Sequence, residues 1–303
     1  MSTTNTAPVT RPTLDNWISI VSLGVIWGGT FMIVAIALRC YGPVTVAAAR
    51  VALGGLALVG LALASGRPFP RLDGLLVAFL LGLGLLNAAL PFLLLAWGQQ
   101  HVPSAFAGLS MAVLPLFLLP LAHVFVPGDQ LTPRRSAGFG MGLIGAVVLL
   151  GPGVLAAGEG DLAALGRLAC IAATLCYAVS SIMTRRCPPM DATWLSAAIL
   201  VVAALGLVPA MLWFEGVPGP ATPGQMGAIV ALGLVPTALA GLLRVRIIRT
   251  AGPGFMTLVN YQVPVWSIVF GVTLLGEDLP GRFYVALALI AGGLFVSQSG
   301  RKT

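Results

Sequence analysis

The sequence predicts an all-α membrane protein in which ten transmembrane helices form two inverted five-helix repeats. Three observations support this fold class: a composition unlike that of soluble proteins, ten long apolar segments, and a similarity between the two halves of the chain. Of the 303 residues, 58% are hydrophobic and 8% are charged, whereas about 25% of the residues in a typical soluble protein are charged. This composition excludes a soluble enzyme and a module that binds nucleic acid.

Ten apolar segments are each long enough to cross about 30 Å of hydrocarbon as a helix. The breaks between them contain Gly and Pro, as in Tyr41-Gly42-Pro43 and Gly252-Pro253-Gly254, which is typical of turns between helices. No cleavage-like site follows the first segment, so we expect it to remain as a span. The predicted spans are residues 17–38, 43–64, 74–97, 104–126, 136–155, 162–183, 192–214, 226–247, 253–275 and 281–298.

The basic residues predict how these spans are oriented. If the N-terminus is cytoplasmic, twelve of the sixteen Lys and Arg residues lie on the inner side, Arg39, Arg167 and Arg282 lie outside, and Arg50 lies within a span. Such a bias is the positive-inside pattern. We therefore expect an inner-membrane protein with both termini in the cytoplasm, and we interpret the net charge of +7 as attraction to membrane lipid rather than to nucleic acid.

The two halves of the chain carry the same pattern. Residues at i, i+3, i+4 and i+7 in the first span have counterparts 150 residues later in the sixth. Because five is odd, the halves must cross the membrane in opposite senses, which is a recurrent plan of secondary transporters. We expect a tail (1–16), a first repeat (17–155), a second repeat (162–298) and a second tail (299–303). The matching residues are Trp27, Thr30, Phe31 and Val34 in span one and Tyr177, Ser180, Ser181 and Thr184 in span six.

Three short segments resemble one family of carriers. The first span reads Ile26-Trp27-Gly28-Gly29-Thr30-Phe31, the second holds Arg50 within Ala48-Ala49-Arg50-Val51, and residues 275–279 read Leu-Gly-Glu-Asp-Leu. With the five-plus-five plan, these segments are similar to the EamA-type, ten-helix exporters of the drug/metabolite transporter superfamily, which include amino-acid exporters. The resemblance covers almost the whole chain and implies a membrane transporter of small organic solutes. The first half departs from the family pattern at Gly128-Asp129, where Gly-Glu is more common.

Polar residues within the spans are candidate substrate-binding groups, because such residues should not face lipid. The clearest group is in span nine, where Thr257, Asn260, Tyr261 and Pro264 fall on one helical face. An alternative is that Thr257 and Asn260 only join helices and that Pro264 only bends the span. The candidates for substrate binding are Trp27, Thr30, Arg50, Asn87, Tyr177, Ser181, Asn260 and Tyr261.

Arg50 and four prolines predict a site inside the bundle. Arg50 lies seven residues after Pro43, which is roughly 10 Å along a helix. We expect Arg50 to meet a substrate carboxylate; the alternatives are that it snorkels to the outer interface or that it caps helix-end carbonyls as a structural tie. Prolines in central spans predict interrupted helices that line a cavity. These helix-breaking prolines are Pro91, Pro115, Pro236 and Pro264.

The remaining conspicuous residues have structural interpretations. Tryptophans at span ends are expected to anchor the membrane interface. Gly138 and Gly142 predict close packing, either between the repeats or in a dimer, so both a monomer and a homodimer are consistent with the sequence. The four cysteines form no CxxC pair and have no nearby His, so we predict neither a metal site nor a cofactor. The expected anchors are Trp17, Trp97, Trp194 and Trp213.

These observations predict a secondary transporter that exports small organic metabolites by alternating access. An intramembrane enzyme would need a catalytic motif such as HExxH or GxSxG, and the sequence has neither. An ion channel would need a ring of charges or a carbonyl filter. A P-loop that could bind ATP is also missing from the sequence.

Substrate and energy coupling follow from the same residues. The resemblance implies amino acids, and the aromatic residues in mid-span predict that large neutral and aromatic side chains are admitted. Proton coupling requires a titratable group in the membrane, and no Asp, Glu or His lies mid-span. We therefore expect a facilitator; the alternative is a proton-coupled drug or metabolite antiporter that uses a displaced group such as His101.

Overall fold

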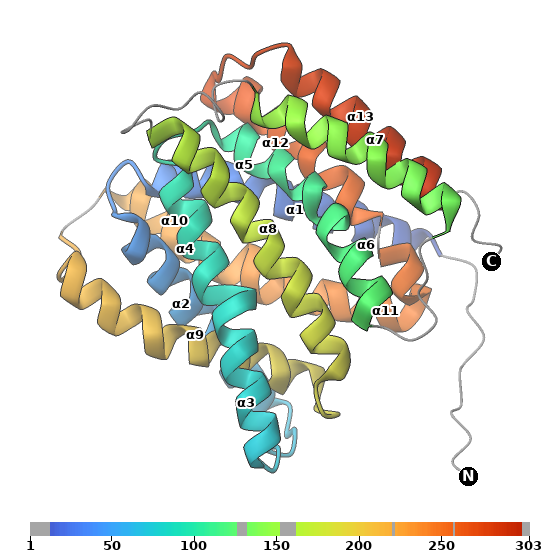
Figure 1. Ribbon diagram of the computed structural model, residues 1–303. Helices are drawn as coiled ribbons and strands as arrows, with labels where there is room; N and C mark the ends of the chain where they lie inside the picture. The colour runs from blue at the N-terminus through green and yellow to red at the C-terminus, as the bar shows by residue number, and fades with distance from the viewer. Residues whose placement is uncertain (1–12, 126–131, 152–161, 220–221, 257, 299–303) are drawn as a thin grey trace, which may run out of the picture.

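The computed structural model describes residues 13–125, 132–151, 162–219, 222–256 and 258–298. All regular elements in these ranges are helices, and they form one bundle (Figure 1). Seven helical segments are long and apolar enough to cross a membrane, and three shorter apolar helices (Ser136–Leu150, Val259–Leu275 and Arg282–Val296) bring the number in the described ranges to ten. The prediction of an all-α protein with ten apolar helical spans is confirmed.

The third span of each repeat is interrupted by a π-helix. The first repeat consists of α1 (Leu14–Ala37), α2 (Pro43–Ala64), α3 (Gly74–Leu83) with the π-helix η1 (Gly84–Ala89) and α4 (Leu90–Gly98), α5 (Ser104–Ser110) with the 3₁₀-helix η2 (Met111–Val113) and α6 (Leu114–Phe125), and α7 (Pro133–Leu150). The second repeat consists of α8 (Leu162–Arg186), α9 (Ala192–Phe214), α10 (Pro223–Gly233) with the π-helix η4 (Leu234–Leu239) and α11 (Ala240–Met256), α12 (Val259–Leu275) and α13 (Arg282–Gln298).

One predicted break is wrong. The sequence predicts that Gly252-Pro253-Gly254 separates spans eight and nine, but α11 continues to Met256 and α12 begins at Val259. A proline removes a single N–H donor from a helix. Pro253 lies in the last turn of α11, where few residues remain to be affected, so the chain reverses direction a few residues later than expected.

Helices of the two repeats pack in reciprocal pairs. The equivalent helices α2 and α9 pack together, as do α7 and α13, which run side by side along one edge of the bundle (Figure 1). α1 packs against α11 and α12, while α8 packs against α4 and α6. The second set of contacts is the first with the repeats exchanged, which is the arrangement that inverted repeats produce.

The contact between α1 and α12 requires a glycine at position 28. A Cβ atom there would lie 3.1 Å from the carbonyl oxygen of Val263 and 3.2 Å from the backbone nitrogen of Ser267. The Cβ atom of Trp266 is the nearest side-chain atom to this position at Gly28. The Trp266 ring stacks on Phe270 with the centroids 5.7 Å apart. Trp266 therefore packs between the repeats, and α1 lies close enough to α12 for residues 28–31 to be buried, while Ile26 and Trp27 are half-buried.

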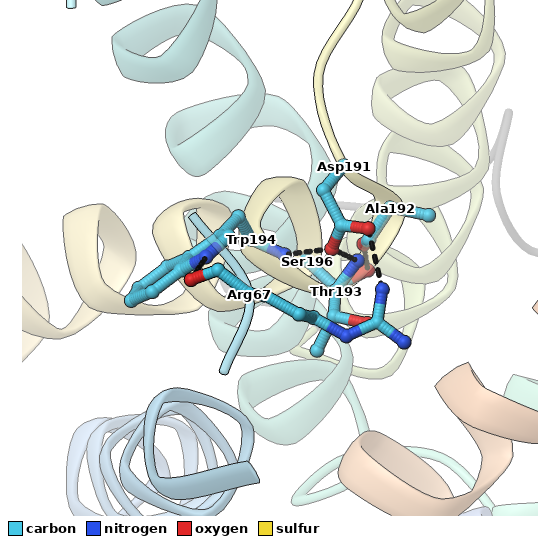
Figure 2. Close-up of polar contacts among 6 residues, drawn as sticks. All are labelled: Arg67, Asp191, Ala192, Thr193, Trp194 and Ser196. Carbon is cyan, nitrogen blue, oxygen red and sulfur yellow. Dashed lines mark hydrogen bonds and ion pairs between the residues drawn. The ribbon is translucent and has the colours of Figure 1, made fainter. Parts of the chain in front are cut away.

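α2 and α9 are antiparallel, and charged contacts join their ends. Glu215, directly after α9, accepts hydrogen bonds from the N–H groups of Val44 (2.9 Å) and Thr45 (2.8 Å) at the start of α2. At the opposite end, Arg67 beyond α2 forms an ion pair with Asp191, the N-cap of α9 (Figure 2). Carboxylates at helix N-termini are stabilised by the unpaired N–H groups there, so each end of this pair joins one repeat to the other.

Asp191 is the centre of a polar cluster at the start of α9 (Figure 2). Its carboxylate accepts hydrogen bonds from the N–H groups of Thr193 (2.9 Å) and Trp194 (3.2 Å) and from Arg67. Burial raises the pKa of Asp191, but these hydrogen bonds outweigh burial and hold the pKa below its usual value. The Trp194 indole donates to the Arg67 carbonyl at 3.3 Å, and Trp194 is 5% exposed. The prediction that Trp194 anchors the interface is wrong, because a neighbouring chain segment covers the ring and supplies its acceptor.

Candidate functional site

The two π-helices lie at equivalent positions in the repeats. η1 starts at Gly84 in the third span and η4 starts at Leu234 in the eighth. A π-helix holds an extra residue in its turn, and such turns are frequent at functional sites. η4 contacts α1 and η1 contacts α8, so each wide turn faces the first span of the other repeat.

The turn of η4 binds two side chains of the first repeat. The Trp27 indole N–H donates to the carbonyl oxygen of Pro236 at 3.2 Å. Arg50 donates from Nε to Thr237 Oγ1 at 3.0 Å, and that hydroxyl donates to the Leu232 carbonyl at 2.8 Å. The wide turn therefore offers the first repeat two hydrogen-bond acceptors, one carbonyl and one hydroxyl.

The turn of η1 makes the reciprocal contact with the second repeat. Asn87 donates from Nδ2 to Ser180 Oγ at 3.2 Å. Ser180 and Ser181 both donate to the carbonyl of Tyr177, at 3.0 Å and 2.7 Å. Of the predicted site residues, Asn87 therefore contacts α8 through Ser180, while Ser181 bonds back to Tyr177 within α8.

Arg50 faces a small pocket of about 10 Å³ between α1, α2 and α4, which has room for about one water molecule in this conformation. Its guanidinium lies 3.7 Å from the centroid of the Phe92 ring, and the residue is 8% exposed. Within the described ranges, Arg50 forms no ion pair with an acid, and its Nη groups form no hydrogen bond. The pocket is lined by Thr30, Phe31, Val34, Val46, Ala47, Arg50, Phe92, Leu95, Ala96 and Gln99.

The predicted site residues fall into two levels along α1. Thr30 lines the pocket of Arg50. Asn260 and Tyr261 lie near the start of α12, where the adjacent Gln262 packs on Gly24 and reaches the Ile20 carbonyl at 3.5 Å. Ten residues of helix from position 20 to position 30 span about 15 Å, so Asn260 and Tyr261 do not share the pocket with Arg50. Thr257, the first residue of the predicted span-nine face, lies outside the described residues.

The predicted helix-breaking prolines lie in different surroundings. Pro236 lies inside η4, and Pro91 follows η1 at the start of α4. Pro115 follows the 3₁₀-helix η2 at the start of α6. Pro264 lies inside α12, which runs from Val259 to Leu275 as one helix. The two π-helices therefore coincide with the prolines of the third and eighth spans.

Three residues around Arg50 are missing from the predicted set. Thr237 directly follows Pro236, and a hydroxyl beside a helix-breaking proline is a signal that could have identified it. Gln99 lies at the end of span three, where an amide is an ordinary interfacial residue, and Phe92 is one of many apolar residues in its span. Only the packing of α4 against α2 reveals the last two.

A metal centre has no support in the described residues, which contain no group of three or more His, Cys, Asp or Glu side chains near enough to hold an ion. The four cysteines are free thiols. Cys170 is buried and Cys40 is exposed.

Comparisons with known proteins agree with this architecture. The EamA-like transporter family matches residues 17–151 and again residues 164–298. "Uncharacterized inner membrane transporter YedA" of Escherichia coli (strain K12) is 26% identical over 285 residues, which cover 93% of this chain and 90% of that protein. A "Probable terminal-alkyne amino-acid exporter" of Streptantibioticus cattleyicolor is 28% identical over 277 residues, 90% of this chain and 88% of that protein. An "S-adenosylmethionine/S-adenosylhomocysteine transporter" of Chlamydia trachomatis serovar L2 is 25% identical over 303 residues, 94% of this chain and 90% of that protein.

A solved crystal structure has the same fold. It is similar with a TM-score of 0.66 at 24% identity, and the alignment covers 95% of this chain and 99% of the other. Two family matches in tandem span nearly the whole sequence and coincide with the two halves of a ten-helix bundle. The chain belongs to the EamA-like transporter family of the drug/metabolite transporter superfamily, and it is a membrane transporter rather than an enzyme.

Proposed function

We propose that this transporter exports small organic metabolites, chiefly amino acids, across the inner membrane by alternating access, with both termini in the cytoplasm. Large neutral and aromatic side chains are admitted, because Phe31 and Phe92 form the walls of the pocket at Arg50. The substrate class is supported by two relatives whose names denote an amino-acid exporter and an S-adenosylmethionine transporter.

Arg50 carries this proposal. A guanidinium within the membrane span is costly without a counter-ion, and Arg50 has no acidic partner in the part of the chain that the structure describes. A substrate carboxylate would supply the missing charge and would accept two parallel hydrogen bonds from a guanidinium. Arg50 is therefore the expected carboxylate-binding residue, with Thr30 in the same pocket.

The two levels of candidate residues fit passage from one side to the other. In the proposed orientation, Asn260 and Tyr261 lie toward the cytoplasmic end, and the pocket of Arg50 lies toward the outer end. Trp27, Asn87 and Ser181 lie between them at the wide turns, where each repeat binds the other. A movement of one repeat against the other would break and remake these few polar contacts and would open the two ends in alternation.

The transporter is proposed to be a facilitator. A proton-coupled carrier needs a titratable group that meets the substrate path. The acids of the described residues lie at helix ends or beyond them, as with Asp15 in the first turn of α1, Asp73 and Asp191 as N-caps, and Glu215 as a C-cap. Arg50 cannot take this role, since a guanidinium does not deprotonate in proteins.

Counterflow in proteoliposomes tests the function. The wild-type protein should exchange labelled leucine and phenylalanine saturably. Arg50→Ala should lower this exchange about tenfold or more, because one charge-assisted contact is worth about 1.5–3 kcal/mol, and Arg50→Lys should retain part of it. Arg39→Ala removes an exposed arginine near the same end of the bundle and is the matched control. Equal exchange by Arg50→Ala and Arg39→Ala would refute the role of Arg50.

The same vesicles test energy coupling. A facilitator should equilibrate leucine without accumulating it when only a pH gradient is imposed. Uphill accumulation driven by the proton gradient would overturn the facilitator proposal in favour of proton antiport. Current that does not saturate with solute concentration would indicate a channel.

A further inference from the structure

Gln99 has an unpaired amide that lines the pocket of Arg50. Both polar atoms of its side chain, Oε1 and Nε2, are buried and have no hydrogen-bond partner among the described residues. An amide that is shielded from water normally finds partners, because leaving a donor or an acceptor unsatisfied costs about 1–3 kcal/mol each. The Gln99 amide therefore has one acceptor and one donor to which a solute in the pocket could bind.

The backbone around Gln99 holds this amide in place. Gln99 is the C-cap of α4 and donates its N–H to the Leu95 carbonyl at 3.0 Å. The preceding residue, Gly98, lies so close to α8 that a Cβ atom there would be 2.9 Å from the carbonyl oxygen of Gly166. Because this contact fixes one face of α4 against α8, the next residue is held toward α1 and α2, where the pocket lies.

The polar groups of the pocket are complementary to a zwitterion. Arg50 supplies a cation with free Nη groups, and a carboxylate is its natural partner. The Gln99 amide has one acceptor and one donor. Its Oε1 can accept a hydrogen bond from an ammonium group, while Nε2 can donate to the carboxylate that Arg50 holds. The rings of Phe31 and Phe92 line the same pocket and would contact a hydrocarbon side chain once the repeats move apart to admit it.

We infer that Gln99 is a specificity-determining residue that selects solutes bearing a free ammonium next to a free carboxylate, that is, α-amino acids. This inference rests on the proposed function and adds to it the recognition of the amino group. It follows that solutes with a blocked amine or a blocked acid bind more weakly, because each loses a charged hydrogen bond in the pocket.

Competition against labelled leucine in counterflow tests the inference on the wild-type protein. N-acetylleucine lacks the ammonium and leucinamide lacks the carboxylate. Each should compete about tenfold or more weakly than leucine, the expected effect of one hydrogen bond to a charged group. If both compete as well as leucine, the inference is overturned without any variant, while leucine transport itself still stands.

Gln99→Met then tests the residue. Methionine has nearly the length of glutamine and no amide, so the variant should bind leucine about tenfold more weakly and should lose most of the discrimination against N-acetylleucine. Gln100→Met is the matched control, because Gln100 is the exposed neighbour and does not line the pocket. It should behave as the wild type does.

The outcomes separate the inference from the proposed function. Discrimination unchanged in Gln99→Met, with exchange still lowered in Arg50→Ala, would overturn the role of Gln99 and leave the carboxylate site intact. A wild-type protein that exchanges no amino acid would remove both. If Gln99→Met does not fold by size-exclusion chromatography, Gln99→Leu is measured in its place, with the same expected loss of discrimination.

Discussion

Trp27 donates its indole N–H to the backbone carbonyl of Pro236, 209 positions later in the chain and in the other repeat. Asn87 and Ser180 make the reciprocal contact between the other pair of equivalent spans. A carbonyl in a regular helix is normally occupied by an N–H four residues later. The proline-containing π-turn therefore provides an acceptor to a neighbouring helix in the middle of the bundle, where water does not compete for it.

Replacing Trp27 by Phe should leave the Pro236 carbonyl without its partner. We expect the free energy of unfolding to fall by about 1–3 kcal/mol. We also expect a lower rate of leucine exchange, because α1 loses its polar contact with η4. Trp266→Phe is the matched control, since the Trp266 ring stacks on Phe270 of the same helix, at the place where α12 packs against α1. Thermal unfolding in detergent and counterflow measure the two effects; a larger loss of exchange in Trp266→Phe than in Trp27→Phe would contradict this prediction.

Glu277 is expected to stabilise the fold rather than to bind solute. It accepts hydrogen bonds from the N–H groups of Ser104 (2.7 Å) and Ala105 (3.0 Å) at the start of α5. Glu277→Ala removes both contacts and the favourable charge at a helix N-terminus, so it should lower stability by about 1–3 kcal/mol. Asp278→Ala changes the exposed acid beside it and should have little effect. The KM for leucine should be the same in both variants at a temperature where both are folded.

Stability should depend on the ionisation of Asp191. The pKa of Asp191 in the folded protein lies below its ordinary value of 3.8, so the folded state favours the carboxylate. This contribution is complete above the unfolded pKa, begins to fall below pH 3.8, and is gone below the lower folded pKa. Asp191→Asn should therefore melt at a lower temperature than the wild type at pH 7, and the difference should shrink as the pH falls below 3.8.

A second variant separates charge from capping at the same position. Asp191→Ala also loses the acceptor for the N–H groups of Thr193 and Trp194. Asp191→Ala should lower the free energy of unfolding by about 1–2 kcal/mol at neutral pH, which is the sum expected for an N-cap and a partly exposed ion pair. Melting temperatures from pH 7 down to acid measure both effects. Equal melting of the wild type and Asp191→Asn at pH 7 would show that the charge contributes nothing.

The orientation of the chain predicts which loops react with an impermeant reagent. Gly219 lies in the loop after α9, and Leu72 lies in the loop after α2; both residues are exposed. In a background that carries Cys40→Ser, Gly219→Cys should react with a membrane-impermeant maleimide in intact cells. Leu72→Cys should react only after the membrane is opened. The reverse pattern would place the termini outside.

The fold could be predicted from the sequence more completely than the site. Span length, breakers and hydropathy are local properties, and ten spans follow from them directly. Even there, the break predicted at Gly252-Pro253-Gly254 is wrong, because α11 continues to Met256. A proline in the last turn of a helix removes only one backbone hydrogen bond. Arg50 could be identified because a charge within a span always needs an explanation.

The partners of Arg50 could not be predicted, because they depend on which helices meet. Thr237 accepts a hydrogen bond from Arg50 and Gln99 lines the same pocket, yet the two residues come from different repeats. Periodicity also assumes a regular helix, whereas the π-turns change which residues share a face. For Asn260 and Tyr261, the pattern identified a polar face on α12 but not its distance from Arg50 along the bundle.

The wide turns make the length of the third and eighth spans as important as their composition. Deleting one residue from η1 (Gly84–Ala89) would rotate the rest of that span by about 100°. Phe92 and Gln99 would then swing away from Arg50, although every lining residue would still be present in the sequence. Single-residue insertions or deletions at these turns would thus offer a route by which carriers of nearly identical composition come to handle different solutes.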